Sequence, residues 1–163
     1  MPLIFSSISS YKEGDLFDIL YSSYDRLLAQ NIKNKEKYIE NWKQFDHDSF
    51  TNPKIGNCVF VSCLNGKPIG LVSYDPRQFP KIGIIGHNCI LPEYRGKGYG
   101  KNQIEYLLKI FEINHCRKVK VETGSIDFYL PAQKMYQSLG FKEVGRHFDE
   151  IRDYEVIEYE KSF

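Results

Sequence analysis

The pattern of apolar and polar residues divides the chain into a helical first part and a later part in which strands and helices alternate. Residues 15–30 and 36–45 carry apolar side chains close to helical spacing, and residues 31–35 between them are polar. The weak alternation over residues 3–8 favours a strand. We therefore expect one short strand and two helices before the main part of a sheet.

Strand-like runs follow, and a short turn joins the first two. Residues 58–64 and 68–74 flank Asn65-Gly66, the dipeptide that most strongly predicts a two-residue hairpin turn. Residues 82–91 form an almost continuous apolar run, as expected of a strand covered on both faces. These runs predict three neighbouring strands of the sheet.

The period then changes to that of a helix and back again. Apolar residues within 104–111 follow the i, i+3, i+4, i+7 pattern, and residues 119–123 return to strand-like composition. This order predicts a βαβ unit with parallel strands and a right-handed crossover. A further helix begins near Pro131 and ends near Gly140, because proline suits a first helical turn and glycine a C-terminal cap.

Two closing strands, near residues 141–147 and 154–161, complete the pattern. We see no repeat, low-complexity tract or Pro/Gly-rich linker that would mark an internal boundary. Residues 1–163 are therefore expected to form a single α/β domain, with a mixed central sheet of about six to seven strands and about four helices.

The charge balance narrows the classes of partner. Lys plus Arg number 22 and Asp plus Glu 21, so no net field recruits nucleic acid or an anionic membrane. No apolar run approaches the roughly 20 residues of a membrane span, and residues 1–5 lack the pattern of a signal peptide. We expect a cytoplasmic protein with no nucleic-acid or membrane partner.

The cysteines do not predict a metal site. They form no C-x-x-C pair and have none of the separations typical of zinc ligands. The four residues are Cys58, Cys63, Cys89 and Cys116. Three of them lie within or beside apolar runs, which favours reduced, buried thiols. We expect no metal cofactor.

A glycine-rich segment, residues 95–101, connects the apolar run of residues 82–91 to the amphipathic helix. Its alternating glycines, Gly96, Gly98 and Gly100, leave the backbone accessible, and its Arg and Lys side chains add positive charge. A helix N-terminus offers unpaired N–H groups and the positive end of the helix dipole, so an anion fits there. The segment predicts a phosphate-binding loop, with a flexible glycine turn as the alternative.

Two common nucleotide-binding motifs do not fit this segment. A P-loop would need glycine at position 95 and Ser or Thr at position 102, where the chain has Arg95 and Asn102. The dinucleotide pattern G-x-G-x-x-G would need glycine where Lys101 stands. A different phosphate-bearing ligand is therefore expected.

The segment Arg95-Gly96-Lys97-Gly98-Tyr99-Gly100 resembles the R-x-x-G-x-G signature of the GNAT N-acetyltransferase superfamily. Downstream, Ala132, Tyr136 and Gly140-Phe141 are similar to that family's A-x-x-x-Y-x-x-x-G-F segment. The resemblance covers residues 82–147. It implies a GNAT-like fold with splayed parallel fourth and fifth strands, acetyl-CoA as co-substrate, and direct transfer to an amine-bearing acceptor. A non-catalytic acyl-CoA-binding module and a structural interaction domain are the alternatives, and a homodimer is left open.

The resemblance also implies where the cofactor binds. The pantetheine arm would bond to the backbone of Asn88, Cys89 and Ile90. Tyr129 stands where many members have a cofactor-contacting asparagine, so it is expected to reach the pantetheine or the acceptor instead. The pyrophosphate would bind along the loop formed by Arg95, Gly96, Lys97, Gly98, Tyr99, Gly100 and Lys101.

Catalytic roles follow in the same way. Tyr136 matches the family's general acid, and a phenol of pKa about 10 is protonated at neutral pH and can donate to a departing thiolate. Glu122 resembles a position that often carries the general base, and His87, with an ordinary pKa near 6.5, is the other candidate. A core tyrosine, a solvated glutamate and a hydrogen-bonded sheet histidine are the respective alternatives.

The acceptor site is the least determined. By resemblance it involves about residues 21–45 and 148–154. One hypothesis is an aromatic, mildly acidic site for a cationic amine, and the alternative is an ordinary helix face beside a solvated acidic loop. The residues concerned are Tyr21, Tyr24, Asp25, Trp42, Asp149, Glu150 and Asp153. Small amines, polyamines, aminoglycosides and peptide N-termini all fit the sequence.

Overall fold

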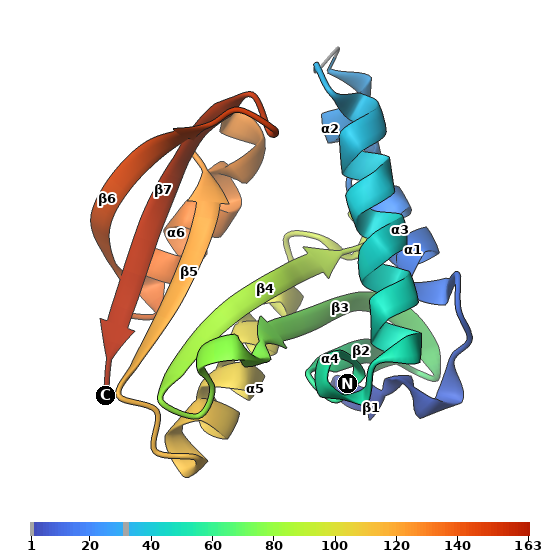
Figure 1. Ribbon diagram of the computed structural model, residues 1–163, viewed down its shortest axis with the longest axis horizontal. Coiled ribbons are helices and arrows are strands. Elements are labelled where there is room, and N and C mark those ends of the chain that lie inside the picture. Colours follow the sequence, from blue (N-terminus) through green and yellow to red (C-terminus); the bar gives the residue numbers. More distant parts are fainter. Residues whose placement is uncertain (1, 31–32) are drawn as a thin grey trace.

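A seven-stranded mixed sheet runs through the computed structural model, which describes residues 2–30 and 33–163 (Figure 1). The strands are β1 (Ile4–Ser7), β2 (Val59–Leu64), β3 (Lys67–Asp75), β4 (Ile82–Ile90), β5 (Lys118–Gly124), β6 (Lys142–Asp149) and β7 (Tyr154–Ser162). The helices are α1 (Asp15–Ser23), α2 (Asp25–Ala29), α3 (Lys35–Thr51), α4 (Pro53–Gly56), α5 (Tyr99–Ile113) and α6 (Leu130–Ser138).

The strand order is β1-β2-β3-β4-β5-β7-β6, with β4 and β5 parallel. This arrangement confirms the predicted α/β class, the mixed sheet and the parallel central pair. The helices α1, α3, α5 and α6 correspond to the predicted four, and α2 and α4 are short additions.

The hairpin between β2 and β3 forms as its dipeptide predicts. Leu64 pairs with Lys67 across the turn. Asn65 and Gly66 both have positive φ, 51° and 76°, as a type I′ turn requires, and this turn matches the twist of the strands it joins.

The predicted single helix over residues 15–30 is wrong, because the chain breaks at Tyr24. There the backbone leaves helical geometry, with φ −109° and ψ 19°, and α2 begins at the next residue. Two interactions hold the break: the Ser23 carbonyl accepts a hydrogen bond from the Arg95 guanidinium, and the Tyr24 ring stacks on Trp42 at 5.3 Å. Part of the predicted connection, residues 31 and 32, lies outside the described residues.

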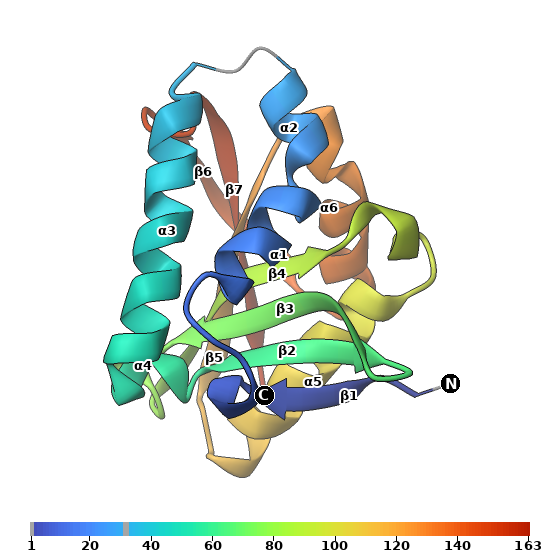
Figure 2. The ribbon, with the colours of Figure 1, turned by 90° about the vertical axis from the view of Figure 1, so that its right-hand side faces the viewer.

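Two hydrophobic cores lie on opposite faces of the sheet (Figure 2). The first joins α1, α2 and α3 to alternate residues of β2 and β3, such as Val61 and Leu71. The second joins α5 and α6 to the other face, where Val72 and Val121 point. Because successive side chains on a strand point to opposite faces, Leu71 and Val72 enter different cores.

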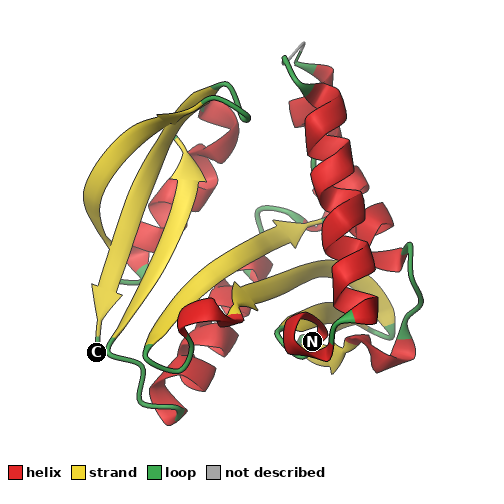
Figure 3. Cartoon of the chain, in the orientation of Figure 1, coloured by secondary structure: helices red, strands yellow, loops and turns green. Residues whose placement is uncertain are grey.

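The strands β4 and β5 pair over a short stretch and then part. Their ladder contains three pairs, from Ile82 with Lys118 to Ile84 with Lys120. Beyond it, the register of β4 against β3 shifts between Val72 and Tyr74, which marks a bulge, and bulges bend the strand that carries them. The two strands therefore diverge toward their C-terminal ends (Figures 1 and 3).

The structure bears on the expectations about the cysteines and about a membrane span. All four cysteines are free and buried, as their apolar surroundings predict. Across the described residues, no helix combines the length and the apolar character needed to cross a bilayer.

Candidate active site

A cavity of about 720 Å³ lies where β4 and β5 part. Tyr24, Tyr38 and Trp42 line it from the side of α1 to α3, and Ala132 and Tyr136 line it from the side of α6. Since these residues belong to the two cores on opposite faces, the cavity is lined from both faces of the sheet.

Tyr136 is both a core residue and a wall of this cavity. Its side chain is 4% exposed and packs edge-on against Phe141, with ring centroids 5.5 Å apart. Burial raises the pKa of the phenol to about 12, and a hydrogen bond with the Asn88 side chain opposes the rise. The phenol therefore stays protonated through the neutral range and beyond.

A buried polar network fixes Asn88 beside Tyr136. Gln103, which is fully buried in α5, donates through Nε2 to the Asn88 side chain and to the Leu71 carbonyl at 3.1 Å. Its own amide oxygen accepts from the Ser62 hydroxyl. Sequence reasoning missed this residue, although a glutamine on the apolar stripe of a helix is a signal of a buried polar contact.

The backbone of β4 offers a free edge to the cavity. Asn88, Cys89 and Ile90 pair on one side with β3. On the other side, the ladder with β5 has ended at Ile84, and no described strand replaces it. An extended ligand can use such an edge as an additional strand would.

Cys89 is poorly suited to covalent chemistry. Its side chain is 4% exposed, and burial raises the pKa of the thiol to about 11. Because the thiolate is the reactive form, this residue is a packing residue of the strand.

The glycine-rich loop presents unused donors, as an anion site requires. None of the backbone N–H groups of residues 96–101 donates a hydrogen bond within the described chain. Gly96 and Gly98 have φ of 75° and 84°, and no atom lies within 4 Å of where a side chain would begin. With α5 starting at Tyr99, these groups fit a pyrophosphate.

The Arg95 side chain faces inward, away from the free N–H groups of residues 96–101. Its Nε donates to the Ile90 carbonyl at 3.1 Å, and its terminal nitrogen donates to the Ser23 carbonyl. The guanidinium also lies 5.5 Å from the centre of the Phe128 ring. The side chain thus ties the loop to the end of α1, and Lys97 and Lys101 are the other cationic side chains of the loop.

His87 lies on the bulged part of β4 and lines the cavity. Its backbone N–H donates to the Ser73 hydroxyl at 2.9 Å, and its ring contacts Phe45 edge-on at 4.4 Å. Burial, followed by the nearby positive charge of Arg152, lowers the pKa of the imidazole to about 4. The ring is therefore neutral at pH 7.

Glu122 lies across the cavity from His87, on β5. Its carboxylate is 46% exposed and lies 3.8 Å from Nη1 of Arg152. Ligand atoms of Glu122, His147 and Glu158 also lie within 4.8 Å of one another, but groups of exposed acids are common without an ion, and we assign no metal here.

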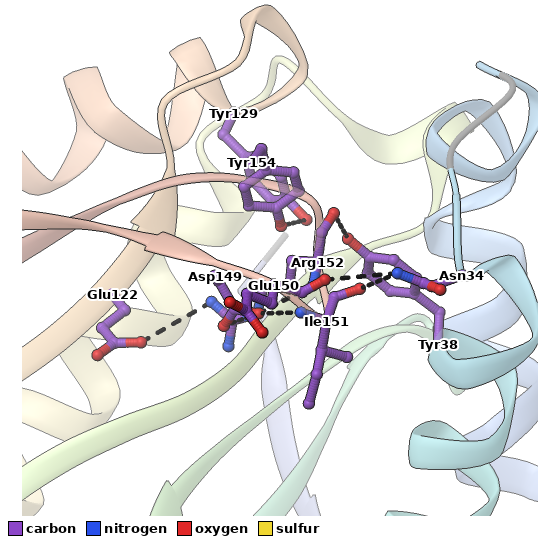
Figure 4. A network of polar contacts seen from close by, with 9 residues as sticks. All are labelled: Asn34, Tyr38, Glu122, Tyr129, Asp149, Glu150, Ile151, Arg152 and Tyr154. Carbon is purple, nitrogen blue, oxygen red and sulfur yellow. Dashed lines mark hydrogen bonds and ion pairs between the residues drawn. The ribbon is translucent and has the colours of Figure 1, made fainter.

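The turn between β6 and β7 lines the cavity and forms polar contacts with Tyr38 of α3 (Figure 4). The Asp149 carboxylate accepts from the backbone N–H groups of Ile151 and Arg152, both at 2.9 Å. The Tyr38 hydroxyl donates to the Arg152 carbonyl at 2.8 Å, and the Asn34 amide reaches the Ile151 carbonyl at 3.3 Å. The turn is therefore fixed through its backbone.

The residues considered for the acceptor divide between this cavity and its surroundings. Tyr24, Trp42 and Asp149 line the cavity. Tyr21, Asp25, Glu150 and Asp153 lie outside its lining. Tyr38, Arg152 and Tyr154 line it as well; they lie within the ranges predicted for the acceptor site, but the sequence did not single them out.

Tyr129 also faces the cavity. Its hydroxyl accepts a hydrogen bond from the Tyr154 hydroxyl at 3.1 Å, and its ring packs edge-on against Phe128 at 4.9 Å. Burial raises the pKa of Tyr129 above its ordinary value. The residue is thus part of an aromatic wall that extends from α3 to β7.

The chain is similar to known acetyltransferases in sequence. A family model described as "Acetyltransferase (GNAT) family" matches residues 16–141. The N-acetylaspartate synthetase of Xenopus tropicalis is 29% identical over 100 residues, covering 61% of this chain and 36% of that protein. Human N-acetyltransferase 8B is 31% identical over 97 residues, covering 57% of this chain and 42% of that protein. The matches thus span less than half the length of these relatives.

Solved structures share the fold over the whole chain. A protein from Pyrococcus horikoshii OT3 superposes with a TM-score of 0.73 and 19% identity, covering 99% of both chains. The PaiA N-acetyltransferase from Thermoplasma acidophilum, solved in complex with coenzyme A, gives a TM-score of 0.72 and 17% identity, covering 100% of both chains. At such identities the likeness concerns the fold.

Proposed function

This chain belongs to the GNAT acetyltransferase family, and on that premise we propose that it transfers acetyl from acetyl-CoA directly to a primary amine of a small molecule or peptide. The observation that carries the proposal is the cavity between β4 and β5, which has the protonated phenol of Tyr136 on one side and Glu122 on the other. Direct transfer needs a donor and an acceptor to meet in one opening from two sides. The raised pKa of the Cys89 thiol supports direct transfer over an acyl-enzyme.

Two parts of the chain are suited to hold the co-substrate. The backbone N–H groups of residues 96–101, which donate no hydrogen bond within the described chain, would bind its pyrophosphate. The free backbone edge of Asn88, Cys89 and Ile90 would bind its pantetheine arm. Lys97 and Lys101 would add positive charge to these contacts, and an ion pair at a solvent-exposed position contributes about 0.2–1 kcal/mol. When bound, acetyl-CoA supplies an activated acetyl group and leaves as the free thiol.

Tyr136 and Glu122 would move the protons of this reaction. The Tyr136 phenol, protonated at neutral pH, would donate its proton to the thiolate as the carbon–sulfur bond breaks. Because a phenol of pKa about 12 is a weaker acid than a thiol, the phenolate would then regain a proton from solvent. Glu122 takes the proton that the amine loses, directly or through water. His87 is the second candidate: its imidazole, of pKa about 4, is neutral at pH 7 but is no stronger a base than an ordinary carboxylate, and the family resemblance places the base at Glu122. A positioned acid or base contributes typically about 10²–10⁴-fold.

The acceptor class draws support from the relatives. The name N-acetylaspartate synthetase describes a protein that forms an acetylated amino acid. Since the match spans 36% of that protein, amino acids enter the proposal as one class of acceptor beside simple amines and peptide N-termini.

A thiol-release assay with acetyl-CoA over a panel of amines tests the function. The panel contains amino acids, simple amines, polyamines, an aminoglycoside and short peptides, and mass spectrometry identifies the product. We expect thiol release that depends on an amine and matches the acetylated product in amount. Calorimetric binding of CoA without release for any amine would contradict transfer and favour an acyl-CoA-binding module.

A further inference from the structure

The Arg152 side chain lines the cavity and forms two long ion pairs, one with Asp149 and one with Glu122. Its Nε lies 3.6 Å from the Asp149 carboxylate and its Nη1 lies 3.8 Å from the Glu122 carboxylate. Both distances exceed those of a hydrogen bond to nitrogen. Over residues 2–30 and 33–163, the guanidinium donates no hydrogen bond, so its five N–H donors remain available.

The other cationic side chains of the cavity are placed differently. Arg77 is bound closely by Asp75, with Nε 2.8 Å and 3.0 Å from the two carboxylate oxygens. Lys120 lies at the closed end of the gap, where β5 still pairs with Ile84 of β4. Arg152 is thus the cation beside the open part of the gap, where transfer would take place.

Arg152 is not needed to hold the turn that carries it. The turn is fixed by the contacts of Asp149 with two backbone N–H groups and of Tyr38 with the Arg152 carbonyl. All of these involve backbone atoms of residues 151 and 152 (Figure 4). A guanidinium that extends into a cavity while its backbone holds the structure is available for a ligand.

We propose that the acceptor carries a carboxylate close to its amine, as an amino acid does, and that Arg152 binds this carboxylate while Glu122 faces the amine. The inference rests on the proposed acetyl transfer and specifies its acceptor. The two side chains present opposite charges 3.8 Å apart, which matches the adjacent charges of a zwitterion. A planar guanidinium with free donors suits a carboxylate, to which it can bond in a bidentate manner.

The surroundings favour a carboxylate over a phosphate. Glu122, Asp149 and Glu158 line the same cavity, and their charges would oppose a dianion more strongly than a monoanion. The aromatic wall of Tyr38 and Trp42 offers apolar area for the acceptor's side chain. Asp149 is among the acidic residues that the sequence suggests as contacts for a cationic amine. Its carboxylate already accepts hydrogen bonds from two backbone N–H groups.

Matched pairs of acceptors test the inference. Aspartate, leucine and phenylalanine are each compared with the α-carboxamide of the same amino acid, at a pH adjusted so that equal fractions of the amine are free. We expect kcat/KM to favour the amino acid by roughly 10–100-fold, the range for one charge-assisted contact. Arg152→Gln should remove this preference, mainly through KM, and leave the carboxamides nearly unaffected. Arg152→Lys should retain part of it, because a lysine keeps the charge without the planar donors.

Arg146→Gln is the matched control. Arg146 lies on β6 with ion pairs to Glu143 and Glu155, outside the cavity lining, and its loss should change neither kcat/KM nor the preference. If the wild-type enzyme acetylates carboxamides as well as amino acids, or if Arg152→Gln lowers both equally, the inference is overturned and acetyl transfer stands.

A binding measurement separates the inference from the transfer itself. N-acetylleucine and N-acetylleucinamide are titrated into the protein saturated with CoA. Binding of the carboxylate form alone, lost in Arg152→Gln, supports the site even if no amine in the panel is acetylated. Equal binding of both forms, or of neither, overturns it.

Discussion

At the scale of single residues, Tyr136 combines a packing role with the proposed role of proton donor. Tyr136→Phe keeps the ring against Phe141 and deletes the hydroxyl that lines the cavity. We expect kcat to fall by about 10–10³-fold with near-normal CoA affinity, as for a group needed in the transition state. Steady-state kinetics and calorimetry measure the two effects. A variant that melts much earlier but turns over normally would show that Tyr136 is a core residue alone.

Glu122 and His87 can be separated by the pH dependence of the rate. Glu122→Gln should depress the rate most with an amine of high pKa, and the defect should shrink as pH rises, because more amine arrives without its proton. His87→Gln should have a smaller effect, because the family resemblance places the base at Glu122 and an imidazole of pKa about 4 offers no greater basicity than a carboxylate. A pH–rate series with one high-pKa acceptor decides this. The reverse order would assign the base to His87, and no effect of either variant would exclude both.

The half-buried His87 should also make stability depend on pH. Its pKa falls from 6.5 to about 4 on folding, so between these values the unfolded chain binds the extra proton. Stability is therefore fully present above pH 6.5 and falls as pH drops toward 4, by at most about 1.4 kcal/mol per pH unit. Denaturant unfolding at pH 7 and pH 4.5 should show a smaller loss in His87→Gln than in wild type. Equal losses would mean that the imidazole is solvated.

At the scale of elements, the start of α5 is the proposed site of cofactor binding. Gly100 has an ordinary φ, and a side chain there would lie 3.9 Å from Ile90, so Gly100→Val should fold normally. We expect it to lose CoA binding by about 10²-fold or more, because the new side chain obstructs the N–H groups of residues 96–101. Calorimetry measures this, with Lys97→Ala as a control that keeps the N–H groups and loses about 10-fold or less. Unchanged affinity in Gly100→Val would remove the basis for the cofactor assignment.

The elements that depend on local patterns were predictable from the sequence. The Asn65-Gly66 turn, the apolar stripe of α5 and the loop before it are encoded in short segments, and the structure contains them. The break at Tyr24 was not predictable, because it depends on Arg95, which lies 72 residues further along the chain and binds the Ser23 carbonyl. The apolar pattern of residues 15–30 carries no information about a distant guanidinium that binds the Ser23 carbonyl.

The candidate site shows the same division between local and distant information. The motifs that predict roles for Tyr136 and for the glycine-rich loop consist of residues that are neighbours in the sequence. Arg152 lies in an acidic, irregular segment and gains its place only when the β6–β7 turn docks on Tyr38, across 114 residues of sequence. The insertion of β7 between β5 and β6 likewise follows from tertiary pairing, and no local pattern specifies it.

At the scale of the whole molecule, the sheet consists of two parts joined by a short seam, the three-pair ladder between β4 and β5. The strands β1 to β4 carry α1 to α4, the strands β5 to β7 carry α6, and three residue pairs of β4 and β5 connect them within the sheet. Beyond Ile84 the two strands face the cavity instead of each other. A ligand that fills the gap would contact both parts, so its binding should stabilise the molecule at this seam.

Coenzyme A should therefore protect the edges of the gap selectively. At 100 times Kd, a ligand that binds the folded state alone adds about 2.7 kcal/mol, or about 5–10 °C in Tm for a chain of this size. Hydrogen exchange should slow at residues 85–90, 96–101 and 121–124, and much less in β1 and β2, which lie away from the gap. Gly100→Val should show neither the shift in Tm nor the protection. If CoA raised Tm while slowing exchange uniformly, or mainly in β1 and β2, then the ligand would bind elsewhere than between β4 and β5, and the cofactor site would have to be reassigned.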